Sequence, residues 1–286
     1  MSEHRKRGFL LENFRLFHLK SKGGSPVEYH YHEFCKILLL LHGRGGYYVD
    51  GQRYLLQSGD IVLLDAHSIH RPELDADVPY ERIILYISPE YLTRHSTADC
   101  NLQTVFSGEN GHVLRLPEEP RQKLFRLAAA LEQTLEGEAF GREILSSAGL
   151  LQLLVEIGRN RENPETSGPN PAMPRSQRIA EILHYIDQHL AEDLDAEALA
   201  NTFFISKYHM MRQFRRETGT TIHLYITQKR LIKARELIDS GMRATEACYR
   251  CGWRSYSSFT RAYGKHLGTT PTGRLDAGQA RDADFE

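Results

Sequence analysis

The chain has 286 residues, enough for two domains with separate hydrophobic cores, and its 26% charged and 41% hydrophobic residues are typical of a water-soluble protein. No apolar run reaches the roughly 18 residues that span a membrane, and the N-terminus is too charged for a signal peptide. We therefore expect a cytoplasmic protein with no membrane partner.

The net charge is −1, yet residues 203–275 carry 14 lysines and arginines against 4 acidic residues, a local charge of +10. Such a block is typical of a surface that binds phosphate.

Residues 28–88 have the pattern of a small β-barrel or jelly roll. Short alternating or apolar segments follow one another at about ten-residue spacing and are separated by turn residues. HGRGG at 42–46 is interpreted as a turn, and the Asp50-Gly51 dipeptide favours the positive φ angles of a hairpin. Strands are predicted at 61–65 and within 79–87.

From residue 120 to residue 160 the hydrophobic pattern has the period of a helix, which predicts two amphipathic helices. They cover the barrel or pair with their counterparts in a second subunit, and we expect a homodimer. Prolines dominate the following segment, which predicts a linker. These features divide the chain into an N-terminal domain at 1–160, a linker at 161–174, a C-terminal domain at 175–275 and a tail at 276–286.

An internal repeat organises the C-terminal domain. Ser206–Gly219 (SKYHMMRQFRRETG) recurs 49 positions later as Ser255–Gly268 (SYSSFTRAYGKHLG). Each copy reads as a short helix, a tight connection and a longer helix that opens on serine, which is the pattern of a helix-turn-helix. A continuous helix at 222–240 joins the two copies. The fold class is therefore multidomain, with an all-β barrel and two helices followed by an all-α domain with two helix-turn-helix motifs.

The longer helix of each copy has a buried stripe and an exposed one. Met210 and Phe214 lie four residues apart and belong to the core, whereas Arg212 lies on another face. Arg261 occupies the slot of Arg212 in the second copy. A guanidinium group can donate two hydrogen bonds to guanine, so both arginines are candidates for reading DNA bases. A surface salt bridge is the alternative.

The four cysteines are too few and too scattered for a disulfide framework. Cys248 and Cys251 form a CxxC pair on the first helix of the second copy, with no second pair of ligands nearby. We expect them to be buried as small hydrophobic groups, and metal or redox chemistry is the alternative.

The sequence resembles the AraC/XylS-type transcription regulators over essentially its whole length. The motifs that carry the resemblance are EALA at 197–200, SKYHMMRQFRRETGTT at 206–221, RLIKARELI at 230–238 and CGWRSYSSFTRAYGKHLGTTPTGR at 251–274. The resemblance implies binding to double-stranded DNA, with RNA polymerase as a further partner. It implies base contacts from Tyr208, Met211, Arg212, Tyr256, Ser257, Ser258, Thr260 and Arg261. Phosphate contacts are expected from Lys207, Arg215, Arg216, Arg254 and Lys265.

The N-terminal half resembles the cupin-type sensor domains of the same family, through HYHEF at 30–34, GYYVDGQRY at 46–54, SGDIVLL at 58–64 and IHRP at 69–72. A small-molecule effector, anionic or polyhydroxylated, is therefore expected in the barrel. Its candidate ligands are His30, His32, Glu33, Lys36 and His70. Cupin enzymes hold a metal with such histidines and a glutamate, but Lys36 stands at the place of that glutamate, so we expect no metal, no cofactor and no catalytic residues.

Three functions stay open at this point. The preferred one is a transcription regulator that reads DNA and responds to an effector. A metal-dependent cupin enzyme fused to a DNA-binding module is the alternative from another class. The third is a ligand-independent regulator in which the barrel histidines only satisfy hydrogen bonds.

Overall fold

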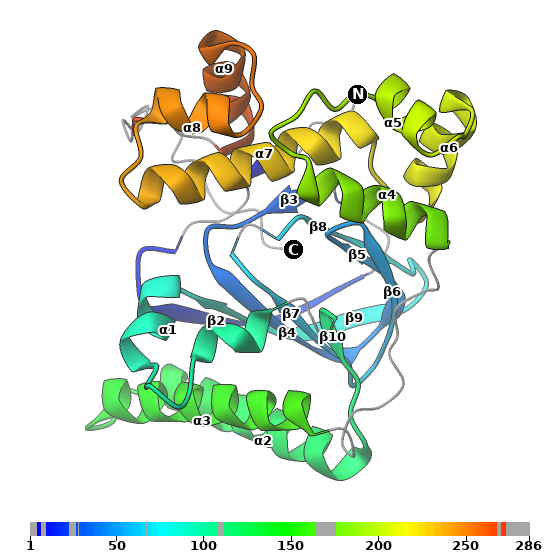
Figure 1. The fold of residues 1–286 in the computed structure, drawn as a ribbon. Helices are drawn as coiled ribbons and strands as arrows, with labels where there is room; N and C mark the ends of the chain where they lie inside the picture. Colours follow the sequence, from blue (N-terminus) through cyan, green and yellow to red (C-terminus); the bar gives the residue numbers. More distant parts are fainter. Residues whose placement is uncertain are drawn as a thin grey trace.

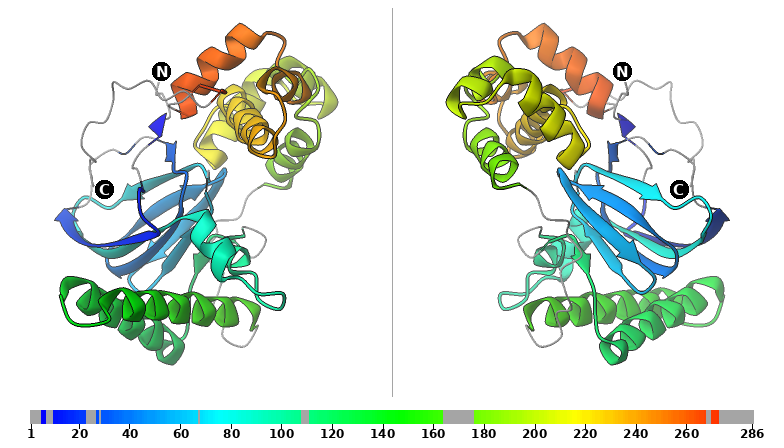
Figure 2. Two further views of the ribbon diagram at one scale, coloured as in Figure 1. Left: turned by 90° about the vertical axis from the view of Figure 1, so that its left-hand side faces the viewer. Right: turned by 90° about the vertical axis from the view of Figure 1, so that its right-hand side faces the viewer.

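The computed structural model describes residues 5–6, 10–22, 27, 29–66, 68–107, 111–163, 176–267 and 270–272. The protein is built in three tiers, with a pair of helices at one end, a β-domain in the middle and a helical domain at the other end (Figures 1 and 2). Most of the predicted linker and the whole predicted tail lie outside the described residues.

The β-domain consists of two five-stranded sheets. One has the order β1 (Arg5–Lys6), β3 (His30–Tyr31), β8 (His70–Leu74), β5 (Arg44–Val49), β6 (Gln52–Gln57), and the other has the order β10 (Val113–Leu114), β7 (Ile61–Leu64), β4 (Cys35–His42), β9 (Pro79–Ile87), β2 (Phe14–Lys22). Neighbouring strands are antiparallel except β1 and β3. The expected all-β domain is thus confirmed, and β2 adds a strand that the sequence pattern did not reveal.

Glycine has two different roles in the first sheet, one in a hairpin turn and one inside a strand. Asp50 and Gly51 have φ angles of 44° and 76°, so the predicted hairpin between β5 and β6 is confirmed. The predicted turn over 42–46 is wrong beyond its first residues, because β5 already begins at Arg44. A Cβ atom on Gly45 would lie 2.8 Å from the Cα of Leu74, so this glycine allows β8 to approach β5 closely.

Two hydrophobic cores hold the β-domain together. Side chains of both sheets, among them Leu38, Tyr47 and Val62, fill the space between the sheets. The other face of the second sheet packs against α1 (Pro89–His95), the 3₁₀ helix η1 (Leu102–Phe106), α2 (Glu118–Glu136) and α3 (Arg142–Glu162). The prediction that the two long helices cover the barrel is therefore confirmed.

The C-terminal domain consists of α4 (Gln177–Gln188), α5 (Ala196–Thr202), α6 (Lys207–Thr218), α7 (Ile222–Asp239), α8 (Ala244–Arg250) and α9 (Tyr256–Leu267). The two predicted helix-turn-helix motifs are α5–α6 and α8–α9, and α7 is the helix that joins them. The first half of α7 packs in the core of the first motif, and its second half packs in the core of the second. No described helix is both long and apolar enough to cross a membrane.

Candidate DNA-reading surface and sensor pocket

The reading helix of the first motif, α6, presents the expected residues to solvent. Met210 and Phe214 are fully buried against α4, α5 and α7. Tyr208 is 84% exposed, and Met211 and Arg212 are exposed beside it. Arg212 has no hydrogen bond or ion pair with any other described residue. The salt-bridge alternative therefore has no support at this position.

The reading helix of the second motif, α9, repeats the arrangement with some differences. Phe259 is fully buried, while Ser257, Ser258 and Arg261 are exposed. Tyr256 is partly buried, with its ring centroid 5.9 Å from that of Phe259. Its neighbour Thr260 donates its hydroxyl to the Tyr256 carbonyl at 2.9 Å. These two predicted base contacts thus have structural uses in the motif as well.

The expected phosphate contacts fall into two groups. Arg215, Arg216 and Lys265 are exposed, although Arg216 also lies 3.4 Å from the neighbouring Glu217 carboxylate. Lys207 pairs with Glu197 at 2.7 Å, and Arg254 pairs with Asp193. Binding of phosphate by these last two side chains would have to replace exposed ion pairs, which are individually weak.

The spacing between the reading helices is set by α7. Its 18 residues correspond to about 27 Å at 1.5 Å per residue. Thr221 caps it by accepting a hydrogen bond from the Leu224 amide at 3.3 Å, and Gly219 begins the connection from α6 with a φ of 74°. Successive major-groove segments on one side of DNA are roughly 34 Å apart. The spacer is therefore of the right order for two adjacent contacts.

Three of the five predicted effector ligands meet inside the β-domain. His30, His32 and His70 are 1%, 4% and 1% exposed. Each ring has one nitrogen that lies within 4.8 Å of a nitrogen of each of the other two rings. Lys36 is equally buried. It lies two residues before Leu38 on β4, so its side chain faces the same side of the sheet, the space between the two sheets. These four side chains could form a polar pocket for an effector.

Glu33, the fifth predicted effector ligand, points elsewhere. Its carboxylate accepts a hydrogen bond from the Arg235 guanidinium on α7. Burial acts to lower the pKa of Arg235, but the Glu33 carboxylate raises it above its ordinary value. Glu33 therefore holds the two domains together in this structure.

Two tyrosines beside Glu33 contact the reading helices. The Tyr29 hydroxyl donates to the carbonyl of Thr218 at 3.1 Å, and the Tyr31 hydroxyl donates to the carbonyl of His266. Burial raises the pKa of both tyrosines far above the ordinary value, so both hydroxyls remain donors at neutral pH. No pattern in the sequence indicates these contacts beyond the alternation of aromatic and histidine residues over 29–32.

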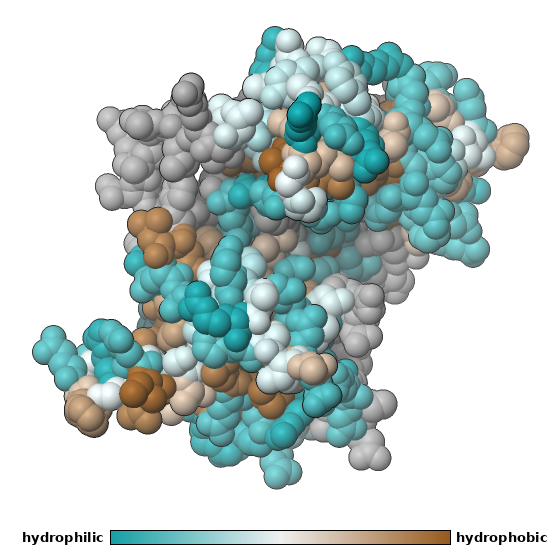
Figure 3. Space-filling view, turned by 60° about the vertical axis from the view of Figure 1, so that its left-hand side comes forward, coloured by the Kyte–Doolittle hydropathy of each residue, from teal (hydrophilic) through white to brown (hydrophobic). Residues whose placement is uncertain are grey.

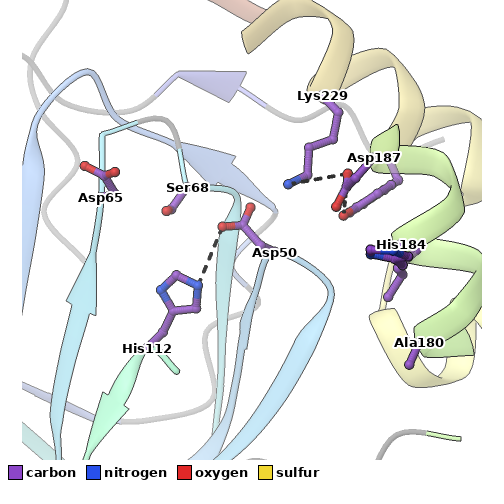
Figure 4. A pocket seen from close by; sticks show the side chains of 10 residues that line it. Asp50, Asp65, Ser68, His112, Ala180, His184, Asp187 and Lys229 are labelled. Atoms are coloured by element: carbon purple, nitrogen blue, oxygen red, sulfur yellow. Dashed lines mark hydrogen bonds and ion pairs between the residues drawn. The ribbon is translucent and has the colours of Figure 1, made fainter. Parts of the chain in front are cut away.

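A polar cleft of about 510 Å³ separates the domains beside this contact (Figure 4). Asp50, Asp65, Ser68 and His112 line it from the β-domain, and His184, Asp187, Tyr225 and Lys229 line it from α4 and α7. Asp50 lies 3.8 Å from His112, and Lys229 lies 3.8 Å from Asp187. No local sequence pattern predicts the cleft, because its walls come from segments far apart in the chain.

The CxxC cysteines are buried, as predicted. Cys248 and Cys251 are 0% and 2% exposed within the core of the second motif. Burial raises the pKa of the Cys251 thiol to about 11, which keeps it protonated at neutral pH.

A pair of helix-turn-helix motifs with exposed arginines on a fixed spacer defines a DNA-binding protein, and the attached β-domain buries a cluster of three histidines and a lysine. Comparison with known families agrees with both parts. Residues 199–275 match the family described as a helix-turn-helix domain, and residues 24–154 match the AraC-like ligand binding domain. The chain belongs to the AraC-type family of transcription regulators. It is a sequence-specific DNA-binding regulator with a ligand-binding domain.

Known transcriptional activators match this chain over most of their length. The HTH-type transcriptional activator RhaS of Shigella sonnei is 28% identical over 261 residues, which cover 88% of each chain. The RhaS of Salmonella heidelberg is 28% identical over 259 residues, covering 89% of this chain and 88% of that one. Among solved structures, the DNA-binding domain of AdpA in complex with a target DNA is 30% identical, covers 34% of this chain and 88% of its own, and has a TM-score of 0.33. Unsaturated fatty acid bound ToxT of Vibrio cholerae is 13% identical, covers 92% and 95%, and has a TM-score of 0.37.

Proposed function

We propose that this protein is a transcription activator that reads two adjacent major-groove segments with α6 and α9 and responds to an effector held in the β-domain. The observation that carries the proposal is the repeated slot of Arg212 and Arg261, both exposed on helices that one spacer holds apart. Activation follows the printed function of the RhaS relatives. Recruitment of RNA polymerase is part of this proposal.

The base-reading group comprises Tyr208, Met211, Arg212, Tyr256, Ser257, Ser258, Thr260 and Arg261. Arginine is suited to guanine, whereas Met211 can offer only apolar contact, for example to a thymine methyl group. Arg215, Arg216, Lys265, Lys207 and Arg254 supply affinity without sequence information. Arg216, Lys207 and Arg254 have to leave their acidic partners to do so.

A homodimer is supported by an apolar surface on the helical tier. Phe140 is fully exposed, and Ile144 and Leu145 at the start of α3 are 75% and 60% exposed. Figure 3 shows hydrophobic side chains gathered at one end of this tier, whereas the opposite domain is mostly hydrophilic. We propose that this surface pairs with a second subunit, and that the protein acts in the cytoplasm and has no enzymatic activity.

Selection of bound DNA from a random pool by the full-length protein tests the proposal. We expect a selected site with two preferred segments about one helical turn, roughly 10 base pairs, apart. Replacement of both Arg212 and Arg261 by alanine should abolish the preference, while Arg159→Ala on α3 serves as a charge-matched control. Recovery of sequences without any common motif would refute sequence-specific reading.

A further inference from the structure

The three buried histidines meet in an arrangement suited to a metal ion. His70 fixes its own ring, because its Nδ1 lies 2.8 Å from the Ser68 carbonyl, which can only accept a hydrogen bond. Nδ1 must therefore carry a proton, and in the neutral ring the lone pair is on Nε2. A hydrogen bond of this kind is the usual support of a metal-binding histidine, since it fixes both the tautomer and the ring orientation.

Neighbouring aromatic rings pack against the histidine rings of the cluster. The ring of Phe34 stacks on that of His32 with centroids 4.6 Å apart and planes 11° apart. The ring of Tyr47 lies parallel to that of His70 at 6.1 Å. The ring centroids of His30 and His70 are 4.3 Å apart. The donor set is thus oriented and shielded from water before any ligand arrives.

We propose that His30, His32 and His70 bind one divalent transition-metal ion, of the type of Zn²⁺, Ni²⁺ or Co²⁺, and that this ion is an effector of DNA binding. The inference rests on the proposed function and names its effector class. Neutral imidazole is a ligand that these ions prefer, and a site with three histidines leaves a coordination position for water or a small anion.

The expectation that Lys36 excludes a metal has to be revised on this view. The three imidazoles converge without Lys36, and the nearby carboxylate of Glu33 is turned toward Arg235. Among the residues that the structure describes, the cluster therefore includes no carboxylate, and the inward ammonium group of Lys36 weakens cation binding further. These features favour an ion that exchanges with its surroundings, which is what a signal requires.

The segment 29–33 connects this site with the DNA-reading helices. His30 and His32 face the cluster, whereas the alternate residues Tyr29, Tyr31 and Glu33 contact the C-terminal domain. In Figure 1, β3 lies at the edge of the β-domain that faces α7. Any ligand that fixes one side of so short a segment also fixes the side chains on the other.

The two tyrosines contact equivalent places on the two reading helices. Tyr29 binds the last residue of α6, Thr218, and Tyr31 binds His266 in the last turn of α9. The opposite, N-terminal halves carry the base-reading residues and stay exposed, as the 84% exposure of Tyr208 shows. An ion that fixes segment 29–33 should therefore fix the relative placement of both helices and strengthen binding to a correctly spaced site.

Metal binding is tested on the full-length protein after chelator treatment and dialysis. We expect titration with Co²⁺ to give visible absorption that saturates at one ion per chain, and Zn²⁺ to displace it. His32→Gln and His70→Gln should lose this absorption, whereas His223→Gln on the exposed side of α7 should keep it. Circular dichroism checks that the variants are folded. Absence of Co²⁺ binding by the wild type, or wild-type binding by both folded cluster variants, would overturn the metal site.

Coupling is tested by the affinity for the selected DNA with and without Zn²⁺. We expect the ion to raise affinity at least about five-fold, the lower end of ordinary coupling between two sites. Tyr31→Phe should bind Co²⁺ normally but lose most of this gain. An unchanged or lowered affinity of the wild type would overturn the coupling. Specific DNA binding without any metal binding would sink this inference alone, whereas metal binding by a protein with no DNA preference would sink the proposed function.

Discussion

Gly219 provides a direct test of the contact between the reading helices and the β-domain. It ends α6 with a φ of 74°, and a Cβ atom there would collide with the hydroxyl of Tyr29. Gly241 is a matched control, because its φ is 97° but a Cβ atom would meet no described atom within 4 Å. Alanine at either position suffers the same left-handed strain, of about 1–2 kcal/mol.

Only Gly219→Ala should also displace Tyr29. The loss of the hydroxyl bond to Thr218 costs about 0.5–1.5 kcal/mol. Tyr29 is 5% exposed, so partial loss of its ring packing adds to this. We expect Gly219→Ala to lower the free energy of unfolding by about 2–4 kcal/mol, and Gly241→Ala by only the strain.

Urea unfolding of both variants measures this difference, and limited proteolysis reports whether the domains separate. In a Tyr29→Ala background the collision with the hydroxyl is absent and only a close approach to Tyr48 Cδ1, at 3.2 Å, remains, so the costs of Gly219→Ala and Gly241→Ala should then become nearly equal. Equal destabilisation of the two glycine variants with Tyr29 present would refute the reasoning. It would show that the contact between Tyr29 and α6 is not maintained in solution.

Three further predictions concern single side chains. Phe214→Ala should cost about 3–5 kcal/mol in urea unfolding, because the ring is fully buried against α4, α5 and α7. Arg115→Met should cost about 3–5 kcal/mol, since the guanidinium donates at 2.8 and 2.7 Å to the Asp60 carboxylate, which is 1% exposed and would be left buried without its counter-ion; a loss below 1 kcal/mol would contradict this. Burial raises the pKa of Asp187 above its ordinary value of 3.8, so its charged form disfavours folding. Stability should therefore gain from Asp187 protonation as pH falls from neutrality toward 4, and melting temperatures of Asp187→Asn should lack this component.

The DNA-reading part could be predicted from the sequence because the relevant information is local and repeated. The 49-residue offset placed Arg212 and Arg261 in equivalent slots, and helical periodicity separated them from the buried Met210 and Phe214. Helical periodicity depends only on residues within a few turns of one another, and the repeat shows the same periodicity a second time.

The contacts between the domains could not be predicted, because they join residues far apart in the chain. Nothing in the local pattern indicates that Tyr31 would bind the carbonyl of His266, or that Glu33 would turn from the barrel toward Arg235. The local pattern assigns Gly45 to a turn for a similar reason, because the close approach of β8 that requires this glycine involves a distant segment. Residues whose contacts lie within their own helix or hairpin could be predicted, whereas residues whose contacts lie in the other domain could not.

The most direct test of the account compares Arg212→Ala and Arg261→Ala on the selected DNA site. Each base pair of the site is substituted in turn, and the affinity of the wild type and both variants is measured at fixed salt concentration. Each variant should lose about 1–3 kcal/mol and relax base preference in one segment only, with the two variants affecting different segments. Uniform weakening on all sequences by both variants would contradict base reading by α6 and α9.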